Sequence, residues 1–111
     1  MDCIFCKIIQ KEIKSEIIFE DDLTLCFKDL KPVSPVHLLI VPKIHITSLF
    51  EVDKNNSHYI SKIFENIPKI SMDICENGFR VVNNNGEDAL QSVEHLHFHI
   101  LGGRQLGWPP C

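Results

Sequence analysis

Apolar positions recur along the chain with two different spacings, which predict short strands and two helices. Short apolar runs, several of them alternating with polar residues, indicate strands over residues 17–20, 23–27, 36–41, 79–82 and 94–101. Apolar residues three or four positions apart indicate a short amphipathic helix over residues 4–13 and one long helix over 54–76. Several strands around one long helix, without regular strand–helix alternation, favour an α+β meander over a doubly wound fold.

Composition narrows the class of protein. The chain has 111 residues, of which 44% are hydrophobic, and this size predicts one globular domain over residues 1–111. The formal net charge is −4, and the Lys and Arg residues form no cluster. A broad surface for long nucleic acid is therefore not expected, although a single nucleotide needs only a few hydrogen-bond donors.

Targeting signals are not expected in this chain. The longest uncharged apolar stretch, residues 32–42, is far shorter than a membrane span and contains prolines. The N-terminus has no basic region or cleavage site of the secretory kind. The five cysteines are an odd set that favours reduced thiols, so we expect a cytoplasmic or nuclear protein.

A row of histidines is the most informative motif. His95, His97 and His99 alternate with apolar residues. Because the strand period is two, all three imidazoles are expected on one face, with the apolar side chains turned into the core. Imidazole suits nucleophilic or proton-transfer chemistry near neutral pH, or metal binding.

A second motif is Cys3-x-x-Cys6 near the N-terminus. Two thiols at this spacing supply half of a tetrahedral zinc site and need two further ligands. The alternative is a pair of small buried residues on one face of the first helix. A redox pair is less favoured, because no thioredoxin-like βαβ pattern follows. The other cysteines, Cys26, Cys75 and Cys111, have no evident role.

The histidine row resembles the signature of the histidine triad (HIT) family, in which three histidines alternate with apolar residues. The resemblance to the Hint branch of this family extends over nearly the whole chain, at Asp29, 35–42, His45, 81–84, 91–93 and the tail at 101–110, which ends in Trp-Pro-Pro. It implies an antiparallel five-stranded sheet with one long and one short N-terminal helix. It also implies a homodimer in which two sheets form one continuous ten-stranded sheet.

The resemblance implies a purine nucleoside phosphoramidase. Such an enzyme hydrolyses the P–N bond of adenosine 5'-monophosphoramidate, or of AMP joined to an amine such as lysine. The middle histidine of the triad, here His97, is the implied nucleophile that forms a nucleotidyl-histidine intermediate. His99 is expected to donate a hydrogen bond to a phosphate oxygen.

Further site residues follow from the same resemblance. His37 is expected to support the nucleophile, Ser92 to protonate the departing amine, and Asp29 to bind the ribose hydroxyls. Asn84 is the expected amide donor to the nucleotide, with Asn83 as the alternative. Simpler roles are a hydrogen-bonded core histidine for His37, loop residues for Ser92 and Asn84, and a turn residue for Asp29.

Microbial members of the family pair such a CxxC with two histidines. The resemblance therefore completes a structural zinc site at Cys3, Cys6, His45 and His95, with four protein ligands and no open position. Animal Hint proteins lack these cysteines, so the metal is not needed for the chemistry. No organic cofactor is expected.

The chain departs from the family at three places. Ala89-Leu90 stands where the family has Gly-Gly, and a leucine with positive φ there costs about 1 kcal/mol, so reduced or altered activity is expected. Lys28 favours an anionic or larger substrate. Cys111 replaces a glycine in the tail, which in Hint dimers shapes the partner's site.

Other activities are open at this point. A diadenosine polyphosphate hydrolase of the Fhit-like branch is less favoured, because those proteins lack the Gly-Gly-Arg-Gln to Trp-Pro-Pro tail. A nucleotidyltransferase is disfavoured by the absence of its His-Pro-His-Gln core. A non-catalytic, zinc-stabilised nucleotide-binding adaptor is the alternative from a different class.

Overall fold

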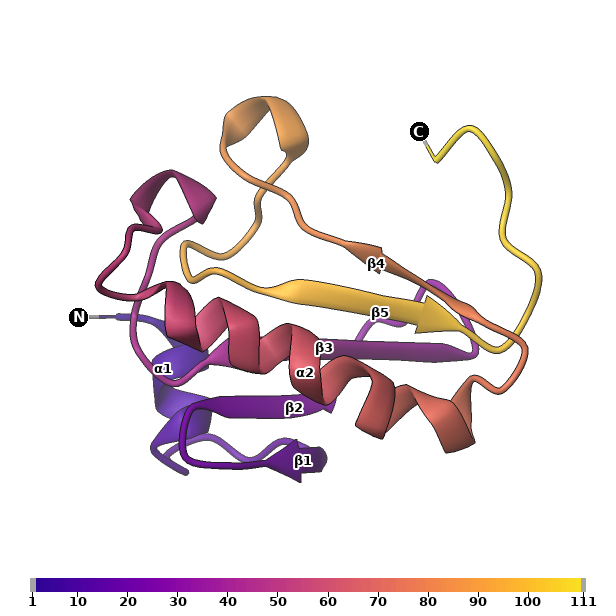
Figure 1. Ribbon diagram of the computed structural model, residues 1–111, viewed down its shortest axis with the longest axis horizontal. Coiled ribbons are helices and arrows are strands. Elements are labelled where there is room, and N and C mark those ends of the chain that lie inside the picture. The colour runs from indigo at the N-terminus through magenta and orange to yellow at the C-terminus, as the bar shows by residue number, and fades with distance from the viewer. Residues whose placement is uncertain (1, 111) are drawn as a thin grey trace.

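The computed structural model describes residues 2–110 and contains one five-stranded antiparallel sheet with strand order β1-β2-β3-β5-β4 (Figure 1). The elements are α1 (Ile4–Ile9), β1 (Ile17–Glu20), β2 (Thr24–Lys28), β3 (Val36–Pro42), the short 3₁₀ helix η1 (Leu49–Glu51), α2 (Ser57–Ile74), β4 (Phe79–Val82), the 3₁₀ helix η2 (Glu87–Ala89) and β5 (Phe98–Gly102). The predicted α+β class and five-stranded sheet are confirmed. Within residues 2–110, no helix is long and apolar enough to span a membrane.

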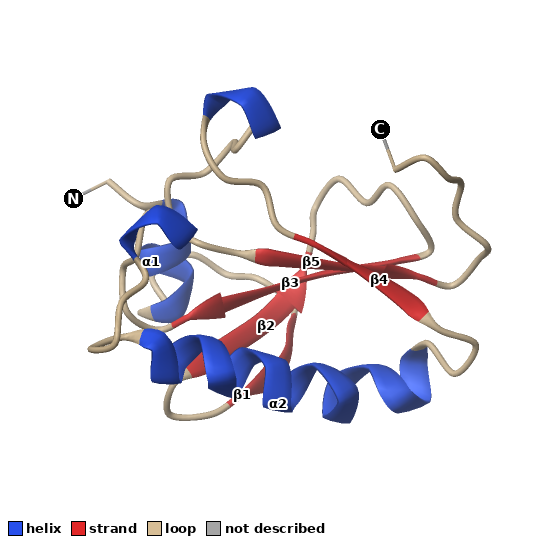
Figure 2. Cartoon of the chain, turned by 45° about the horizontal axis from the view of Figure 1, so that its top comes forward, coloured by secondary structure: helices blue, strands red, loops and turns tan. Residues whose placement is uncertain are grey.

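The two α-helices lie on opposite faces of the sheet, with α2 along one face and α1 against the other (Figure 2). The α2 face buries the larger core, made of Cys26, Leu38, Ile40, Ile46, Ile63, Ile67, Ile70, Leu96, Phe98 and Ile100. The α1 face buries a smaller cluster of Cys3, Phe5, Ile8, Leu25, Phe27, Leu39 and Val41. Alternate residues of β2 and β3 therefore serve the two cores in turn.

The histidines occupy the α1 face of this sheet. In β5, Phe98 and Ile100 belong to the α2 core, so His99 between them points to the other side. His99 pairs directly with Leu39 of β3, a member of the α1 cluster. The predicted alternation of imidazoles and core residues is therefore confirmed at the strand.

The predicted boundaries that differ from the structure do so by one to four residues, and the two largest errors are at the end of α1 and the start of β5. The helix predicted over residues 4–13 ends at Ile9, and Lys11 just beyond it has a φ of 65°, which a right-handed helix cannot include. The strand predicted from residue 94 begins only at Phe98. The preceding segment bends at residues 93–95 and is attached elsewhere, because the Leu96 N–H donates to the Ile46 carbonyl at 2.7 Å.

The turn between β1 and β2 is held to α2 by one carboxylate. Asp21 accepts hydrogen bonds from the backbone N–H groups of Leu23 and Thr24, from the Thr24 hydroxyl, and from the Asn66 amide of α2 at 2.8 Å. Burial acts to raise the pKa of the Asp21 carboxyl, but these donors outweigh it and lower the pKa from 3.8 to about 2.

This geometry predicts a pH-dependent contribution to stability. Because the pKa of Asp21 is lower in the folded chain than its ordinary value, the stabilisation is complete above about pH 4 and disappears as the pH falls toward about 2. Asp21→Asn should lower the free energy of unfolding by about 2 kcal/mol at pH 7, measured by urea denaturation. The difference from wild type should shrink through the same acid range.

Asp22→Asn is the matched control, since Asp22 is the exposed neighbour in the same turn. It should leave the free energy of unfolding nearly unchanged at every pH. A destabilisation by Asp21→Asn that persists undiminished at pH 2.5 would contradict the assignment.

Candidate functional site

A cavity of about 430 Å³ lies on the α1 face of the sheet, where His97 and His99 meet α1 and the end of β2. Its walls are largely apolar and include Phe5 and Ile8 of α1, Phe27 of β2 and Leu39 of β3. Polar groups line one side, where Asp29 and Ser92 accompany the two histidines. An apolar pocket with a few convergent polar groups suits a small organic ligand that carries one charged end.

The backbone fixes the hydrogen of His97. Its Nδ1 lies 2.7 Å from the carbonyl oxygen of His95, and a carbonyl can only accept, so Nδ1 carries the hydrogen. The lone pair is therefore on Nε2. His97 is only 2% exposed, and burial lowers the pKa of its imidazole. The ring is neutral near pH 7 and has the form that a nucleophile requires.

His37 and His99 form a hydrogen-bonded pair whose direction is also set by the backbone. The Val33 N–H donates to Nδ1 of His37 at 3.1 Å, so the hydrogen of His37 is on Nε2. That Nε2 lies 2.8 Å from Nδ1 of His99 and donates to it. His99 must then carry its own hydrogen on Nε2, where it can donate to a ligand in the cavity that it lines.

Both rings of this pair are neutral. Burial lowers the pKa of His37, and Asp29 nearby only partly opposes the effect. Burial lowers the pKa of His99 to about 4, and the neighbouring rings of His97 and His37 contribute to this shift. The pair is therefore a directed chain of neutral hydrogen bonds rather than a charged site.

Asp29 lies at the start of the loop between β2 and β3. Its Oδ1 accepts the Lys31 N–H at 2.7 Å, which is the turn role considered from the sequence. Its Oδ2 lies 3.4 Å from Nε2 of His37, at the edge of the cavity. Asp29 thus combines a turn with a carboxylate oxygen directed to the site.

Four predicted metal ligands also come together. The Cys3 Sγ lies 3.3 Å from Nδ1 of His95, and the Cys6 Sγ lies 3.4 Å from Nδ1 of His45 and 3.6 Å from Nδ1 of His95. All four ligand atoms lie within 4.8 Å of one another. A tetrahedral zinc with bonds of about 2.0–2.3 Å has ligand–ligand edges of about 3.3–3.8 Å, which these distances match.

The tautomer of His95 suits metal binding. Its Nε2 lies 3.0 Å from the Pro42 carbonyl oxygen, so Nε2 carries the hydrogen and Nδ1 offers its lone pair to the thiols. Burial lowers the pKa of this fully enclosed imidazole to about 4. The thiol groups and imidazoles therefore form a donor set that fits zinc.

A second group of possible ligands, Asp29, His37 and His99, has the wrong protonation pattern for a metal. A neutral histidine that binds a metal through Nε2 must carry its hydrogen on Nδ1. In His37, Nδ1 accepts the Val33 N–H and therefore carries none. The structure thus separates the two histidine groups into one that suits a metal and one that relays hydrogen bonds.

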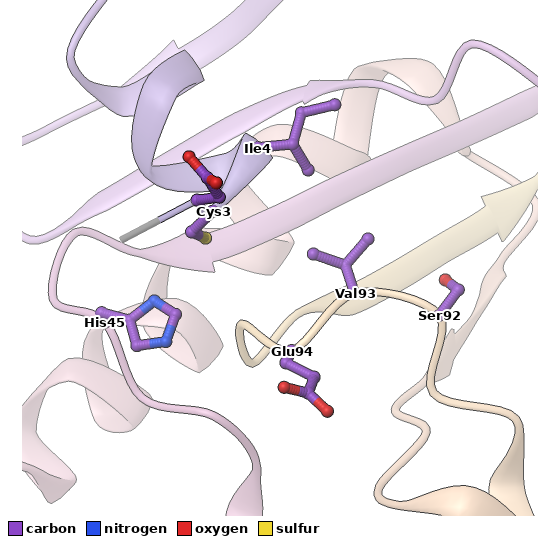
Figure 3. Close-up of a pocket in the computed structure, with 7 residues that line it drawn as sticks. Cys3, Ile4, His45, Ser92, Val93 and Glu94 are labelled. Carbon is purple, nitrogen blue, oxygen red and sulfur yellow. The ribbon is translucent and has the colours of Figure 1, made fainter.

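A smaller cavity of about 360 Å³ borders the Cys/His group. Figure 3 shows Cys3 and His45 on one side of it, and Val93 and Glu94 on the other. Ser92 lines this cavity and also the larger one, so the Ser92–Val93 segment separates the candidate metal cluster from the histidine site.

The loop residues near the site make different contacts. The Asn83 amide donates to the His97 carbonyl at 2.8 Å, and Asn84 is its half-buried neighbour. Ser92 is exposed at the edge of the cavity. Gln91 connects the loop to its surroundings, because its amide N–H groups donate to the Thr47 and Val93 carbonyls and its oxygen accepts the Gly86 N–H.

Two contributors were missed from the sequence. Phe5, interpreted only as a helix residue, lies with its ring centroid 5.9 Å from that of His95 and 5.1 Å from that of His97, so it packs between the two histidine groups. The Val33 N–H was missed because a backbone group carries no sequence signal. The apolar spacing of α1 could have indicated that Phe5 faces the sheet, but not which histidines it meets.

Comparisons with known proteins place this chain among related sequences and structures. The sequence profile of the family described as scavenger mRNA decapping enzyme C-term binding matches residues 2–107. The 14 kDa zinc-binding protein of Brassica juncea is 40% identical over 112 residues, which cover 98% of this chain and 99% of that protein. Adenylylsulfatase HINT1 of Arabidopsis thaliana is 40% identical over 110 residues, covering 96% of this chain and 75% of that protein.

A solved structure is similar over nearly the whole chain. The HIT family hydrolase from Clostridium thermocellum superposes with a TM-score of 0.91 and is 42% identical, covering 96% of this chain and 94% of that one. The similarity therefore extends from sequence to fold over both chains.

Leu90 generates a testable prediction. It follows η2 with φ 58° and ψ 44°, a left-handed conformation that disfavours a residue with a Cβ atom, and its side chain is 84% exposed. Leu90→Gly relieves this strain but adds freedom to the unfolded chain, so the free energy of unfolding should rise by about 0.5–1 kcal/mol in thermal or urea denaturation.

Ala89→Gly is the matched control, because Ala89 lies inside the 3₁₀ turn and gains only unfolded-state freedom. This variant should be destabilised. If both glycine variants lose stability equally, the left-handed conformation at Leu90 carries no measurable strain.

Proposed function

The chain belongs to the histidine triad family, in its Hint-like branch, and is a HIT family hydrolase; from that premise we propose that it hydrolyses the P–N bond of adenosine 5'-monophosphoramidate and of AMP joined to amines such as lysine. The observation that carries the proposal is the hydrogen bond from Nδ1 of His97 to the His95 carbonyl, which leaves Nε2 free as a nucleophile beside the cavity.

The cavity supports the binding of a purine nucleoside monophosphate. A purine ring would pack on its apolar wall, where Phe5, Ile8 and Phe27 lie. Asp29 would accept hydrogen bonds from the ribose hydroxyls. The phosphate would then lie toward His97 and His99. The hydrogen on Nε2 of His99 can donate to a phosphate oxygen.

In the first chemical step, Nε2 of His97 attacks phosphorus while the P–N bond breaks. The departing nitrogen takes a proton from the Ser92 hydroxyl and leaves as a neutral amine. His97 now carries the nucleotidyl group on Nε2, and the His95 carbonyl stabilises the positive ring through Nδ1. The Asn83 amide, which donates to the His97 carbonyl, keeps the loop against this strand.

In the second step, water attacks phosphorus and the bond to His97 breaks. The water oxygen stays on phosphorus in AMP, and a proton from the water returns to Ser92. His97 regains its lone pair on Nε2. The two steps together consume one water molecule and release AMP and the amine.

We further propose that Cys3, Cys6, His45 and His95 hold a structural zinc ion. Zinc supplies no chemistry to the reaction here; with four protein ligands it stabilises the fold. The support is the ligand spacing and the hydrogen bond from His95 Nε2 to the Pro42 carbonyl. The name of the Brassica juncea relative agrees with this assignment.

A homodimer is proposed from the family resemblance. The strand order leaves β4 at one edge of the sheet, and a second copy pairing there would extend the sheet to the ten strands expected. The exposed Trp108 lies near this edge, with its ring 5.8 Å from the Arg80 guanidinium of β4.

The proposed reaction predicts loss of turnover in His97→Ala. Without the nucleophile, release of AMP from adenosine phosphoramidate should fall by at least about 10³-fold, measured by chromatography with matched circular dichroism spectra. AMP binding, measured by calorimetry, should be retained. His58→Ala, at an exposed position of α2, is the control and should keep wild-type turnover.

Adenylyl sulfate is assayed beside the phosphoramidate, because one relative is named an adenylylsulfatase. If only adenylyl sulfate is cleaved, the bond that the enzyme hydrolyses is the P–O bond to sulfate and not a P–N bond. Failure of wild type on both substrates, with AMP still bound, would instead favour the nucleotide-binding adaptor.

The second prediction concerns zinc. Wild-type protein should contain about one zinc per chain by atomic absorption, and Cys6→Ser should lose it, because a hydroxyl cannot replace a thiolate ligand. The melting temperature of wild type should fall with a chelator, whereas that of Cys6→Ser should not respond. Cys75→Ser, far from the cluster, should retain the metal; zinc-free wild-type protein overturns the assignment.

A further inference from the structure

Two acceptor atoms lie near Nε2 of His37, and one of them, Nδ1 of His99, is hydrogen-bonded to it in this structure. Because the Val33 N–H occupies Nδ1 of His37, the hydrogen on Nε2 is the only N–H hydrogen of the neutral ring. Nδ1 of His99 lies at 2.8 Å and Oδ2 of Asp29 at 3.4 Å. The carboxylate is farther away but carries a full charge, and charge strengthens an acceptor.

The choice between these acceptors sets the tautomer of His99. When His37 donates to His99, Nδ1 of His99 is an acceptor and its hydrogen is on Nε2. When Asp29 draws the hydrogen of His37 away, Nδ1 of His99 loses its donor and can carry the hydrogen itself. Nε2 of His99 would then present a lone pair to an anionic phosphate oxygen, which is repulsive.

Only one oxygen of Asp29 takes part in this competition. Oδ1 accepts the Lys31 N–H at 2.7 Å, so Oδ2 is the oxygen available both to His37 and to a ribose hydroxyl. The Asp29 side chain is 21% exposed and lines the cavity, whereas the His37 side chain is 5% exposed, so Asp29 is the one of the two that a ligand in the cavity can contact.

We propose that Asp29 is a positioning residue that couples ribose binding to the tautomer of His99. A ribose hydroxyl that donates to Oδ2 of Asp29 makes this oxygen a weaker competitor for the His37 hydrogen. His37 then donates that hydrogen to Nδ1 of His99. Ribonucleotide binding thereby raises the fraction of His99 that carries the phosphate-donating hydrogen on Nε2. This inference rests on the proposed nucleotide site and makes the ribose hydroxyls contributors to the chemical step as well as to binding.

The direct test uses nuclear magnetic resonance of the ¹⁵N-labelled full chain with adenosine, which has the ribose but no phosphate. The fraction of His99 with its hydrogen on Nε2 should rise on saturation with adenosine. The matched probe, 2',3'-dideoxyadenosine, lacks both hydroxyls and should leave the fraction unchanged. An equal response to both nucleosides, or no response to adenosine, overturns the proposal.

A kinetic test separates coupling from simple binding. In wild type, the 2'-deoxy form of adenosine phosphoramidate should have a kcat at least about fivefold below that of the ribose form. In Asp29→Ala, the competitor for the His37 hydrogen is gone, so the two kcat values should converge while KM for the ribose form rises. A merely structural role of Asp29 would lower both kcat values alike and leave their ratio at its wild-type value, which overturns the proposal.

The two tests distinguish this inference from the proposed function. The tautomer measurement requires no turnover, so a response to adenosine in a protein without phosphoramidase activity supports the coupling and removes only the proposed reaction. Turnover of the phosphoramidate with a His99 tautomer that ignores adenosine removes only the coupling.

Discussion

The position of a single hydrogen on each buried imidazole is the constraint on which the site depends. Backbone groups decide it in three places: the Pro42 carbonyl for His95, the His95 carbonyl for His97, and the Val33 N–H for His37. These partners cannot exchange donor and acceptor roles, unlike hydroxyls or water. Burial also keeps the rings neutral, because it lowers their pKa values. Chemically identical side chains thereby become a candidate metal ligand, a candidate nucleophile and a hydrogen-bond relay.

The Cys/His cluster and the histidine site are connected through shared residues and packing contacts. His95 belongs to the first and supplies the carbonyl that orients His97 in the second. Phe5 packs against both rings from α1, the helix that also carries the Cys6 ligand. A displacement of α1 would therefore disturb the proposed nucleophile. The proposed zinc would act on catalysis only through this packing.

Much of this arrangement could be predicted from the sequence, and what could not has a physical reason. The period of two placed His95, His97 and His99 on one face, and the limits of β1 and β4 were predicted as observed. The start of β5 was missed because the backbone before Phe98 bends and is bonded to Ile46, which no local pattern reveals. The directions of the hydrogen bonds could not be predicted, since they depend on backbone groups brought close by folding. At Leu90 the sequence was informative, because the family has glycine there and the residue has a left-handed conformation in the structure.

The Cys/His cluster brings together groups from the two ends of the chain. Cys3 and His95 are separated by 92 positions, yet their ligand atoms lie 3.3 Å apart. During synthesis from the N-terminus, both thiols leave the ribosome long before His95 has been made. Until then Cys3 and Cys6 have no folded environment to shield them from oxidants or from stray metal ions. The nascent chain thus carries two unprotected thiols until the segment that contains His95 has been translated and folded.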